Sequence, residues 1–444
     1  MRGRRLGIVV SGGPAPGINA VIGAATIEAS NQHFDVIGFY DGFRWLCSEA
    51  FDDAKHLTRL DIAQVARIHF AGGSILRTSR TNLLDEQRLK TSVVASPDET
   101  KLQRVLGHLR RLKIDSLITL GGDDTALSAR FIAEASKGAV RVVHIPKTID
   151  NDLPLPHDTA TFGFSTARFV GTQLVKNLME DSRTTGRWYL VTTMGRNAGW
   201  LALAICQASG ATLSLIPEEF AEQATVQQIT DVLEGAILKR RVMGRPDGVA
   251  VIAEGLAYRL GDRAELERLL GKEVPVDAAG HPRLSEVPLG EMLRTELRRR
   301  FAERGENLPI VTHTLGYELR SADPAPSDMA YCRALGHGSI RILLDSTADF
   351  ASGAMVALVN GNLLPLDLGD LVDPRTNRIR IRLVDVRSDM YRVARAYMIR
   401  LERTDLDDPK MLVQLAAEAR LSPEEFRKRF LRAGTRLVDG LPEG

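Results

Sequence analysis

The stretch ITLGGDDTALSA, residues 118–129, decides the fold class because its periodicity changes in the middle. Its apolar, β-branched start predicts a buried strand, and its end has the spacing of an amphipathic helix. The glycine pair between them predicts a tight turn of the kind that brings backbone N–H groups close to a phosphate. Asp123 and Asp124 place two negative charges at this turn, which raises the question of what the second acid would exclude from a phosphate site.

The same strand–turn–helix alternation continues on both sides of this stretch. The pattern predicts strands at 6–13, 35–43, 116–122, 141–152, 187–195, 211–219 and 247–255, and helices at 18–32, 98–114, 124–137, 167–185, 197–208 and 225–242. It indicates an α/β fold with mostly parallel sheets and helices on both faces. Because the rhythm repeats, we expect two Rossmann-like three-layer lobes with the active site in the cleft between them, beyond the carboxyl ends of the strands.

Three later segments give further local predictions. Residues 256–308 are charged and helix-prone, which is typical of an insertion, and the Asn-Gly pair within 356–366 predicts a hairpin. Residues 421–434 predict a helix that Ser422 caps with Glu425 and that Gly434 ends.

The composition excludes several function classes. The chain has 44% hydrophobic and 26% charged residues, and its 58 Lys and Arg nearly balance its 56 Asp and Glu. A near-neutral chain without polybasic blocks favours neither a nucleic acid nor a membrane surface as partner. The apolar stretch 199–217 is interrupted by polar residues, which predicts a buried helix and strand. Three scattered cysteines favour a reducing, cytoplasmic location.

The segment PKTIDND (146–152) carries the densest chemistry in the chain. In an extended backbone Thr148, Asp150 and Asp152 would point the same way. One carboxylate could take a proton from an attacking hydroxyl while the other shapes the metal and charge environment. Lys147 adds a cation beside them, and the alternative reading is a loop rich in Asp and Asn.

Glycine turns and arginines surround this segment in the predicted sheets. Gly13 lies in SGGPAPGIN (11–19), which is either a phosphate turn or a tight strand-to-helix turn. Asp123 is placed to hold Mg²⁺ against phosphate oxygens, unless it only caps the next helix. Several arginines follow strand ends or glycine loops and could clamp anions: Arg80, Arg187, Arg196 and Arg320.

Together these motifs resemble the phosphofructokinase family. The resemblance covers about residues 4–255 and 310–375 and rests on motifs in the family's order. These are SGGPAPGIN, GGSILRTSR (72–80), GGDDT (121–125), PKTIDND, MGR (194–196), IAEG (252–255) and LGYELRSADPAPSD (315–328). The resemblance implies Mg²⁺-dependent phosphoryl transfer to the 1-hydroxyl of fructose 6-phosphate.

The resemblance also implies a role for each matching residue. Asp150 would be the general base, Asp123 would hold Mg²⁺, and Arg196 would steady the transferred phosphoryl group. Lys147, Thr148 and Asp152 would line the transfer site, with Gly13, Arg80 and Asp124 at the phosphoryl donor. Fructose 6-phosphate would be held by Met194, Gly195, Glu254, Tyr317 and Arg320. Arg187 would reach the sugar phosphate of a neighbouring subunit, which implies a homodimer or homotetramer.

The choice of donor depends on Asp124 and Lys147. ATP-using members usually carry Gly at both positions, and Asp124 would repel the α-phosphate of a nucleotide at a cost of several kcal/mol. The pair resembles the pyrophosphate-dependent branch. Three alternatives stay open: an ATP-dependent enzyme, a kinase of another sugar phosphate such as sedoheptulose 7-phosphate, and a non-catalytic subunit. An Arg often found before LGY is missing from IVTHTLGY, which leaves the sugar open.

The resemblance also implies how the chain is divided. Residues 1–160 with about 320–375 would form the donor-binding lobe, and residues 161–319 the sugar-phosphate lobe with its insertion near 256–308. Residues 376–444 would form a C-terminal helical extension.

Overall fold

The computed structural model describes residues 4–90, 92–156, 158–220, 224–260, 266–268, 288–347 and 350–434. The chain divides into two compact units, and each is built from separate stretches of sequence. Unit 1 contains Met1–Ala167 and Tyr317–Arg382, and unit 2 contains Arg168–Gly316 and Leu383–Gly444. Which unit binds which substrate stays a prediction.

Unit 1 is organised around one sheet with the strand order β12-β11-β5-β4-β1-β2-β3, and β6 pairs with β5. Its inner strands are parallel, whereas β3 and β12 are antiparallel to their neighbours. The strand bounds are β1 Arg5–Val10, β2 Asp35–Phe39, β3 Leu57–Leu60, β4 Ser116–Gly121, β5 Arg141–Thr148, β6 Phe162–Gly163, β11 Ala354–Val359 and β12 Asn362–Asp367. Every residue of β4 is buried, as expected for a central parallel strand covered on both faces.

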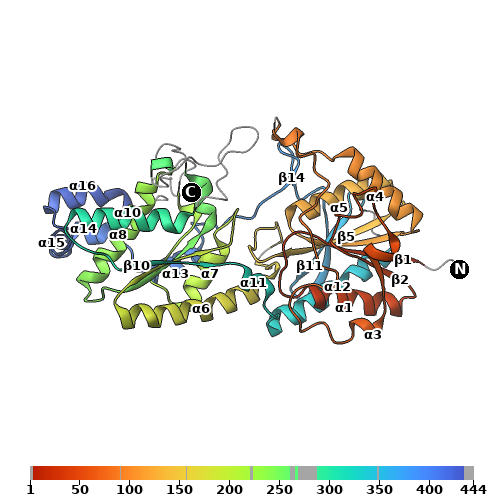
Figure 1. Ribbon diagram of the computed structural model, residues 1–444, viewed down its shortest axis with the longest axis horizontal. Coiled ribbons are helices and arrows are strands. Elements are labelled where there is room, and N and C mark those ends of the chain that lie inside the picture. The colour runs from red at the N-terminus through yellow and green to blue at the C-terminus, as the bar shows by residue number, and fades with distance from the viewer. Residues whose placement is uncertain are drawn as a thin grey trace. The chain divides into compact units, whose positions relative to one another are not determined.

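Helices cover both faces of this sheet. Figure 1 shows α4 (Glu99–Arg111) and α5 (Asp123–Ser136) on one face, and α1 (Ile18–Asn31) and α12 (Pro326–Leu344) on the other. The shorter elements of unit 1 are α2 Asp53–His56, α3 Ile62–Val65, η1 Arg88–Lys90, α11 Tyr317–Ser321, β13 Val372–Asp373 and β14 Arg378–Ile379.

Unit 2 contains a parallel sheet in the order β10-β7-β9-β8. Its strands are β7 Trp188–Thr193, β8 Leu213–Leu215, β9 Gly248–Ala253 and β10 Ile310–Leu315. Its helices include α7 Trp200–Ser209, α8 Val226–Val242 and α10 Leu289–Glu303, with the 3-10 turns η2 Pro217–Glu219 and η3 Glu254–Arg259; α6 Phe164–Thr185 begins in unit 1 and continues into unit 2.

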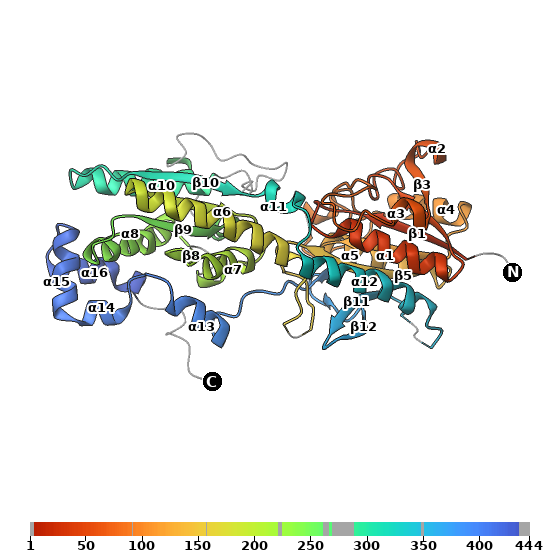
Figure 2. The same ribbon diagram turned by 90° about the horizontal axis from the view of Figure 1, so that it is seen from below.

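The second stretch of unit 2, which begins at Leu383, contributes four described helices. These are α13 Asp389–Ala396, α14 Arg403–Asp407, α15 Pro409–Glu418 and α16 Pro423–Gly434. Helices α15 and α16 both pack against α8, as Figure 2 shows.

The predicted α/β fold with mostly parallel sheets is confirmed. The hairpin within 356–366 is also confirmed, because Asn360 and Gly361 take the positive φ angles that a tight hairpin turn needs. Ser422 caps α16 as expected, since it exchanges hydrogen bonds with Glu425 at 2.9 and 3.3 Å. Of the predicted insertion, residues 261–265 and 269–287 lie outside the described part. In the part of the chain that is described, no helix is long and apolar enough to cross a membrane.

Candidate active site

The carboxyl ends of β1, β4 and β5 lie side by side in unit 1. The pairs Val10–Leu120 and Gly121–Pro146 are in register across these strands. Three sequence motifs that lie far apart along the chain, the two glycine turns and PKTIDND, therefore meet at one edge of the sheet. This is the edge at which parallel α/β sheets bind ligands.

Two cations lie against the first glycine turn. The buried Lys147 ammonium donates a hydrogen bond to the carbonyl oxygen of Gly13. A Cβ at Gly12 would lie 3.2 Å from Lys147 Nζ, and one at Gly13 would lie 3.0 Å from the guanidinium carbon of Arg320. The glycines thus allow both cations to approach the backbone closely, which concentrates positive charge where a phosphate compound would bind.

The environment of Lys147 changes its acidity. Burial lowers the pKa of this ammonium to about 7, and the charge of Arg320 acts in the same direction. The carboxylates of Asp150 and Asp123 oppose this shift. A buried cation with a perturbed pKa beside a glycine turn is a typical feature of a functional site.

The second glycine turn is fixed from beneath by a buried histidine. His144 Nε2 donates to the carbonyl oxygen of Gly121 at 3.1 Å, and the Thr119 hydroxyl donates to His144 Nδ1 at 2.9 Å. Burial lowers the pKa of His144 to about 3, so the ring is neutral and one nitrogen can accept. A Cβ at Gly121 would lie 2.2 Å from the Thr125 side chain, so only glycine fits there.

Asp123 and Asp124 open helix α5 directly after this turn. A carboxylate in the first turn of a helix is stabilised by the exposed N–H groups and the helix dipole. Asp124 also accepts a hydrogen bond from Asn82 Nδ2 at 3.4 Å. Both acids are therefore held at the sheet edge on which Lys147 lies.

The backbone of PKTIDND differs from the predicted extended form. Strand β5 ends at Thr148, and Asn151 has a φ angle of 57°, in the left-handed region. The inference that Asp150 and Asp152 point the same way because of strand alternation is therefore wrong. The turn has its own hydrogen bonds, because the Asp150 N–H donates to the Thr148 hydroxyl at 3.0 Å and Asn151 Oδ1 accepts from the Thr161 N–H at 3.0 Å.

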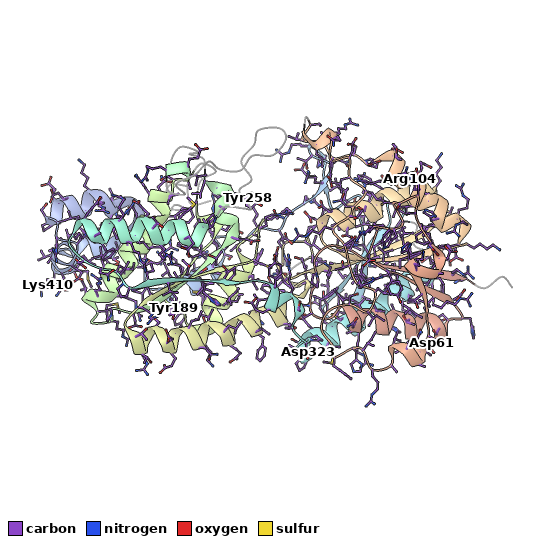
Figure 3. All side chains as sticks on the ribbon, viewed as in Figure 1. Asp61, Arg104, Tyr189, Tyr258, Asp323 and Lys410 are labelled. Carbon is purple, nitrogen blue, oxygen red and sulfur yellow. The ribbon has the colours of Figure 1, made fainter. Side chains whose placement is uncertain are left out.

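The loop that ends in Arg80 lies along the first glycine turn. The Gly12 N–H donates to the Ser79 carbonyl at 2.7 Å, and the Thr78 hydroxyl donates to the Gly12 carbonyl at 2.7 Å. These bonds place the exposed Arg80 next to the turn. At the other end of the loop the Gly72 N–H donates to Asp323, labelled in Figure 3, at 2.8 Å.

A second set of predicted residues meets at the carboxyl edge of the unit 2 sheet. Thr193 is in register with Ala253 and with Leu315, so the segments after β7, β9 and β10 are neighbours. The Gly195 carbonyl accepts the Gly255 N–H at 3.1 Å, and Gly195 takes a φ of 122° that few other residues adopt. Met194, Gly195, Arg196 and Glu254 therefore form one cluster, whereas Tyr317 and Arg320 belong to unit 1.

Arg187 does not join that cluster within one copy of the chain. It precedes β7, whereas Met194 follows the same strand, and a six-residue strand spans roughly 20 Å. Its Nε lies 4.0 Å from Asp181, which also accepts the hydroxyl of Tyr189, labelled in Figure 3.

Sequence reasoning missed the residues that support the site through distant contacts. His144 lies inside a strand and was not distinguished from its apolar neighbours. Arg382, which lies 231 residues after Asn151, donates to the Asn151 carbonyl at 3.1 Å and to the Thr159 carbonyl at 2.7 Å. A lone arginine in an irregular segment carries no motif, so no sequence signal could have found it.

These features first define a class, the α/β proteins that handle phosphate compounds at the carboxyl ends of parallel strands. Residues 5–343 match the sequence model of the family described as Phosphofructokinase, and the chain belongs to this family.

Relatives of known name support this assignment. The chain is 53% identical over 426 residues to the pyrophosphate–fructose 6-phosphate 1-phosphotransferase of Thermotoga maritima, covering 96% of this chain and 98% of the relative. It is 43% identical to the protein of the same name from Naegleria fowleri, covering 96% and 94%. It is 30% identical to ATP-dependent 6-phosphofructokinase 3 of Streptomyces coelicolor, covering 83% and 95%.

Solved structures agree on the fold. The chain is similar to Pichia pastoris phosphofructokinase in the T-state, with a TM-score of 0.63, 21% identity and coverage of 100% of this chain and 41% of that one. It is also similar to the pyrophosphate-dependent phosphofructokinase of Marinobacter aquaeolei, with a TM-score of 0.60, 16% identity and coverage of 89% and 90%.

Proposed function

We propose that the chain is an enzyme that transfers a phosphoryl group reversibly from pyrophosphate to the 1-hydroxyl of fructose 6-phosphate, with Mg²⁺. The observation that carries this proposal is the buried Lys147 ammonium on the Gly13 turn, next to a helix that begins with Asp123 and Asp124. The names of the relatives at 53% and 43% identity support the same donor and acceptor.

In the proposed step the oxygen of the sugar 1-hydroxyl attacks a phosphorus atom of pyrophosphate, and Asp150 takes the proton of that hydroxyl. The bond from that phosphorus to the bridging oxygen breaks, phosphate leaves, and fructose 1,6-bisphosphate forms. In the reverse direction protonated Asp150 returns the proton to the sugar oxygen. Lys147, Thr148, Asp152 and Arg196 would orient the reacting groups and stabilise charge, which is most of the catalytic work in phosphoryl transfer.

The residues present fit a magnesium ion shared with the substrate. Among the described residues no group of three or more His, Cys, Asp or Glu side chains could hold a metal. Mg²⁺ needs only one or two carboxylates when phosphate oxygens complete its shell, and Asp123 at the second glycine turn fits that role. When bound, the ion would neutralise phosphate charge and fix its geometry.

Selection of the donor would depend on Asp124. Its carboxylate is tied to Asn82 on the sheet edge that holds Lys147. Pyrophosphate is compact and would use the cations without passing this acid, whereas the α-phosphate of ATP would meet a like charge. Gly13 and Arg80 would contact the donor beside it.

The acceptor would be held by the second cluster. Met194, Gly195 and Glu254 lie together on unit 2, and we assign them to fructose 6-phosphate. Tyr317, with 76% of its surface exposed, and Arg320 lie on α11 of unit 1, and we assign them to the same substrate. Arg320 also lies against Gly13, so we extend its role to the phosphoryl group in transfer.

The assembly is also part of the proposal. Arg187 lies at the opposite end of β7 from Met194, which fits a residue that serves a neighbouring subunit of a homodimer or homotetramer. We place the enzyme in the cytoplasm, where Cys47, Cys206 and Cys332, all buried and unlinked in the structure, would stay reduced.

The test is phosphorylation of fructose 6-phosphate with Mg²⁺ and either pyrophosphate or ATP, on the wild type and Asp124→Gly. We expect the wild type to use pyrophosphate and the variant to gain at least about tenfold in kcat/KM for ATP, since a like-charge contact costs over 1.4 kcal/mol. Glu99→Gly, which removes an exposed acid from the first turn of α4, is the matched control. A wild type that prefers ATP would overturn the donor assignment. The acceptor is tested by replacing fructose 6-phosphate with sedoheptulose 7-phosphate, and a preference for the latter would overturn the acceptor assignment.

A further inference from the structure

Arg382 holds the turn that carries the two acids of PKTIDND. Its Nη1 donates to the Thr159 carbonyl at 2.7 Å, and its Nη2 and Nε donate to the Asn151 carbonyl at 3.1 and 3.3 Å. Its backbone N–H donates to the Asp152 carbonyl at 2.8 Å. Its guanidinium also bonds the amide oxygen of the Asn151 side chain. One residue therefore bonds the turn at Asn151 and Asp152 and also the later Thr159 of the same loop.

The turn needs this support because its backbone is strained. Asn151 takes a left-handed φ between the two acidic residues, and such a conformation persists only when its surroundings determine it. Because β5 has ended at Thr148, sheet pairing no longer fixes the peptides that follow. A rotation at Asn151 would move Asp150 and Asp152 in different directions.

The form of the Arg382 side chain suits this task. A guanidinium presents a planar fork of donors that can bond two carbonyls at once, which a lysine ammonium on a flexible stem cannot reproduce. Burial lowers the pKa of Arg382, while the charges of Asp152 and Asp158 oppose the shift. The guanidinium is thus partly removed from water, and its hydrogen bonds to the carbonyl oxygens offset the cost of this burial.

We infer that Arg382 is a positioning residue for phosphoryl transfer, which acts through the Asn151 peptide to hold Asp150 and Asp152 in their working geometry. The inference rests on the proposed roles of those two acids. It concerns the transfer step and not the choice of donor, so it applies with pyrophosphate or with ATP.

The experiment compares Arg382→Ala and Arg382→Lys with Arg380→Ala. Arg380 is an exposed arginine of the same segment that donates to the Asp370 carbonyl, so its variant controls for loss of a guanidinium. Displacement of a reacting group by about 1 Å can cost a hundredfold, so we expect kcat of Arg382→Ala to fall roughly ten- to hundredfold. The KM values for donor and acceptor should stay within about threefold of the wild type, because the binding groups are untouched.

Chemical rescue separates positioning from general stabilisation. Millimolar guanidinium chloride should restore part of kcat in Arg382→Ala, but not in Arg382→Lys or Arg380→Ala. If Arg382→Ala does not fold, Arg382→Lys decides, since a folded lysine variant with wild-type kcat would overturn the inference. A folded Arg382→Ala with kcat within about twofold of the wild type, or a loss that guanidinium leaves unchanged, would overturn it as well.

The same assays distinguish the inference from the proposed function. Each variant is measured with the donor that the wild type uses. A wild type that is active with ATP alone would end the pyrophosphate proposal and leave the Arg382 comparison intact. A wild type inactive with both donors would overturn both.

Discussion

The two units bury charge in opposite ways. In unit 1 the Lys147 ammonium bonds a backbone carbonyl, and within the described part of the chain it forms no ion pair with a carboxylate. In unit 2 the fully buried Glu234 is paired with Arg300 and Arg429, each at 2.8 Å, and with Arg304. Lys147 is therefore placed as the proposed binding of an anionic ligand requires, whereas Glu234 is neutralised within the protein.

The difference follows from what each charge connects. Glu234 on α8 joins Arg300 and Arg304, on or next to α10, with Arg429 on α16, so the cluster ties the last described helix to the rest of unit 2. Burial lowers the pKa of Arg304 to about 10. A buried ionic cluster stays folded only when its members compensate one another. In the proposed site Lys147 would bind the anionic substrate from a rigid turn, so an ion pair within the protein would weaken that binding.

Replacing Lys147 gives the largest effect that this comparison predicts. Lys147→Met should lower kcat/KM for pyrophosphate roughly a hundred- to thousandfold, because a buried charged contact to a ligand is worth several kcal/mol. The melting temperature should stay the same or rise, since methionine fills the space without the cost of burying a charge. Steady-state kinetics and thermal melting measure both, with the exposed Lys410→Met as control. A lower melting temperature would make Lys147 a structural cation like those of unit 2.

Removing the charge of Glu234 should have the opposite effect, because it should lower stability and leave the kinetics with pyrophosphate unchanged. Glu234→Gln removes the buried charge that pairs with Arg300, Arg304 and Arg429, and breaking buried ion pairs in this way should cost about 3–5 kcal/mol of unfolding free energy. The folded variant should keep the wild-type KM for pyrophosphate, because Lys147 and Gly13 belong to unit 1. Urea unfolding, followed by a spectroscopic signal that arises from unit 2, measures the unfolding free energy. Steady-state kinetics at low temperature measure the KM of the folded variant. An unchanged unfolding midpoint would contradict the assignment of the cluster to stability.

The pH dependence of donor binding sharpens the comparison with a smaller effect. The pKa of Lys147 is about 7 because of burial and of the charge of Arg320, against the pull of Asp150 and Asp123. The ammonium is charged below this pKa and neutral above it, so kcat/KM for pyrophosphate should fall toward tenfold per pH unit above about pH 7. In Lys147→Arg the fall of kcat/KM above about pH 7 should be much weaker, since a guanidinium stays charged over this pH range. If kcat/KM of Lys147→Arg fell at the same pH as in the wild type, the fall would have to be assigned to another titrating group.

The same contrast explains how much could be predicted from the sequence. Parallel strands bring their carboxyl ends together, so the motifs that follow β1, β4 and β5 could be assigned to one edge from their positions alone. The turn at Asn151 could not, because its φ depends on Thr161 and Arg382, which are remote in sequence. The sequence pattern also did not predict strand β10 or helix α12. In β10 the sequence IVTHTL mixes polar and apolar residues without a clear period. The Glu234 cluster depends on the packing of several helices and has no linear signature.

The smallest effect concerns the helix that supplies Arg429 to that cluster. Ser422→Ala removes the hydroxyl that accepts the Glu425 N–H at 3.3 Å, and loss of such a cap costs about 1 kcal/mol. Because α16 packs on α8 and carries one arginine of the Glu234 cluster, the loss should loosen the last helix before the rest of unit 2. Hydrogen exchange should therefore rise first in residues 423–434, with pyrophosphate kinetics unchanged. If exchange rose equally in α8, then α16 and α8 would open as one unit, and the expected order of unfolding would be wrong.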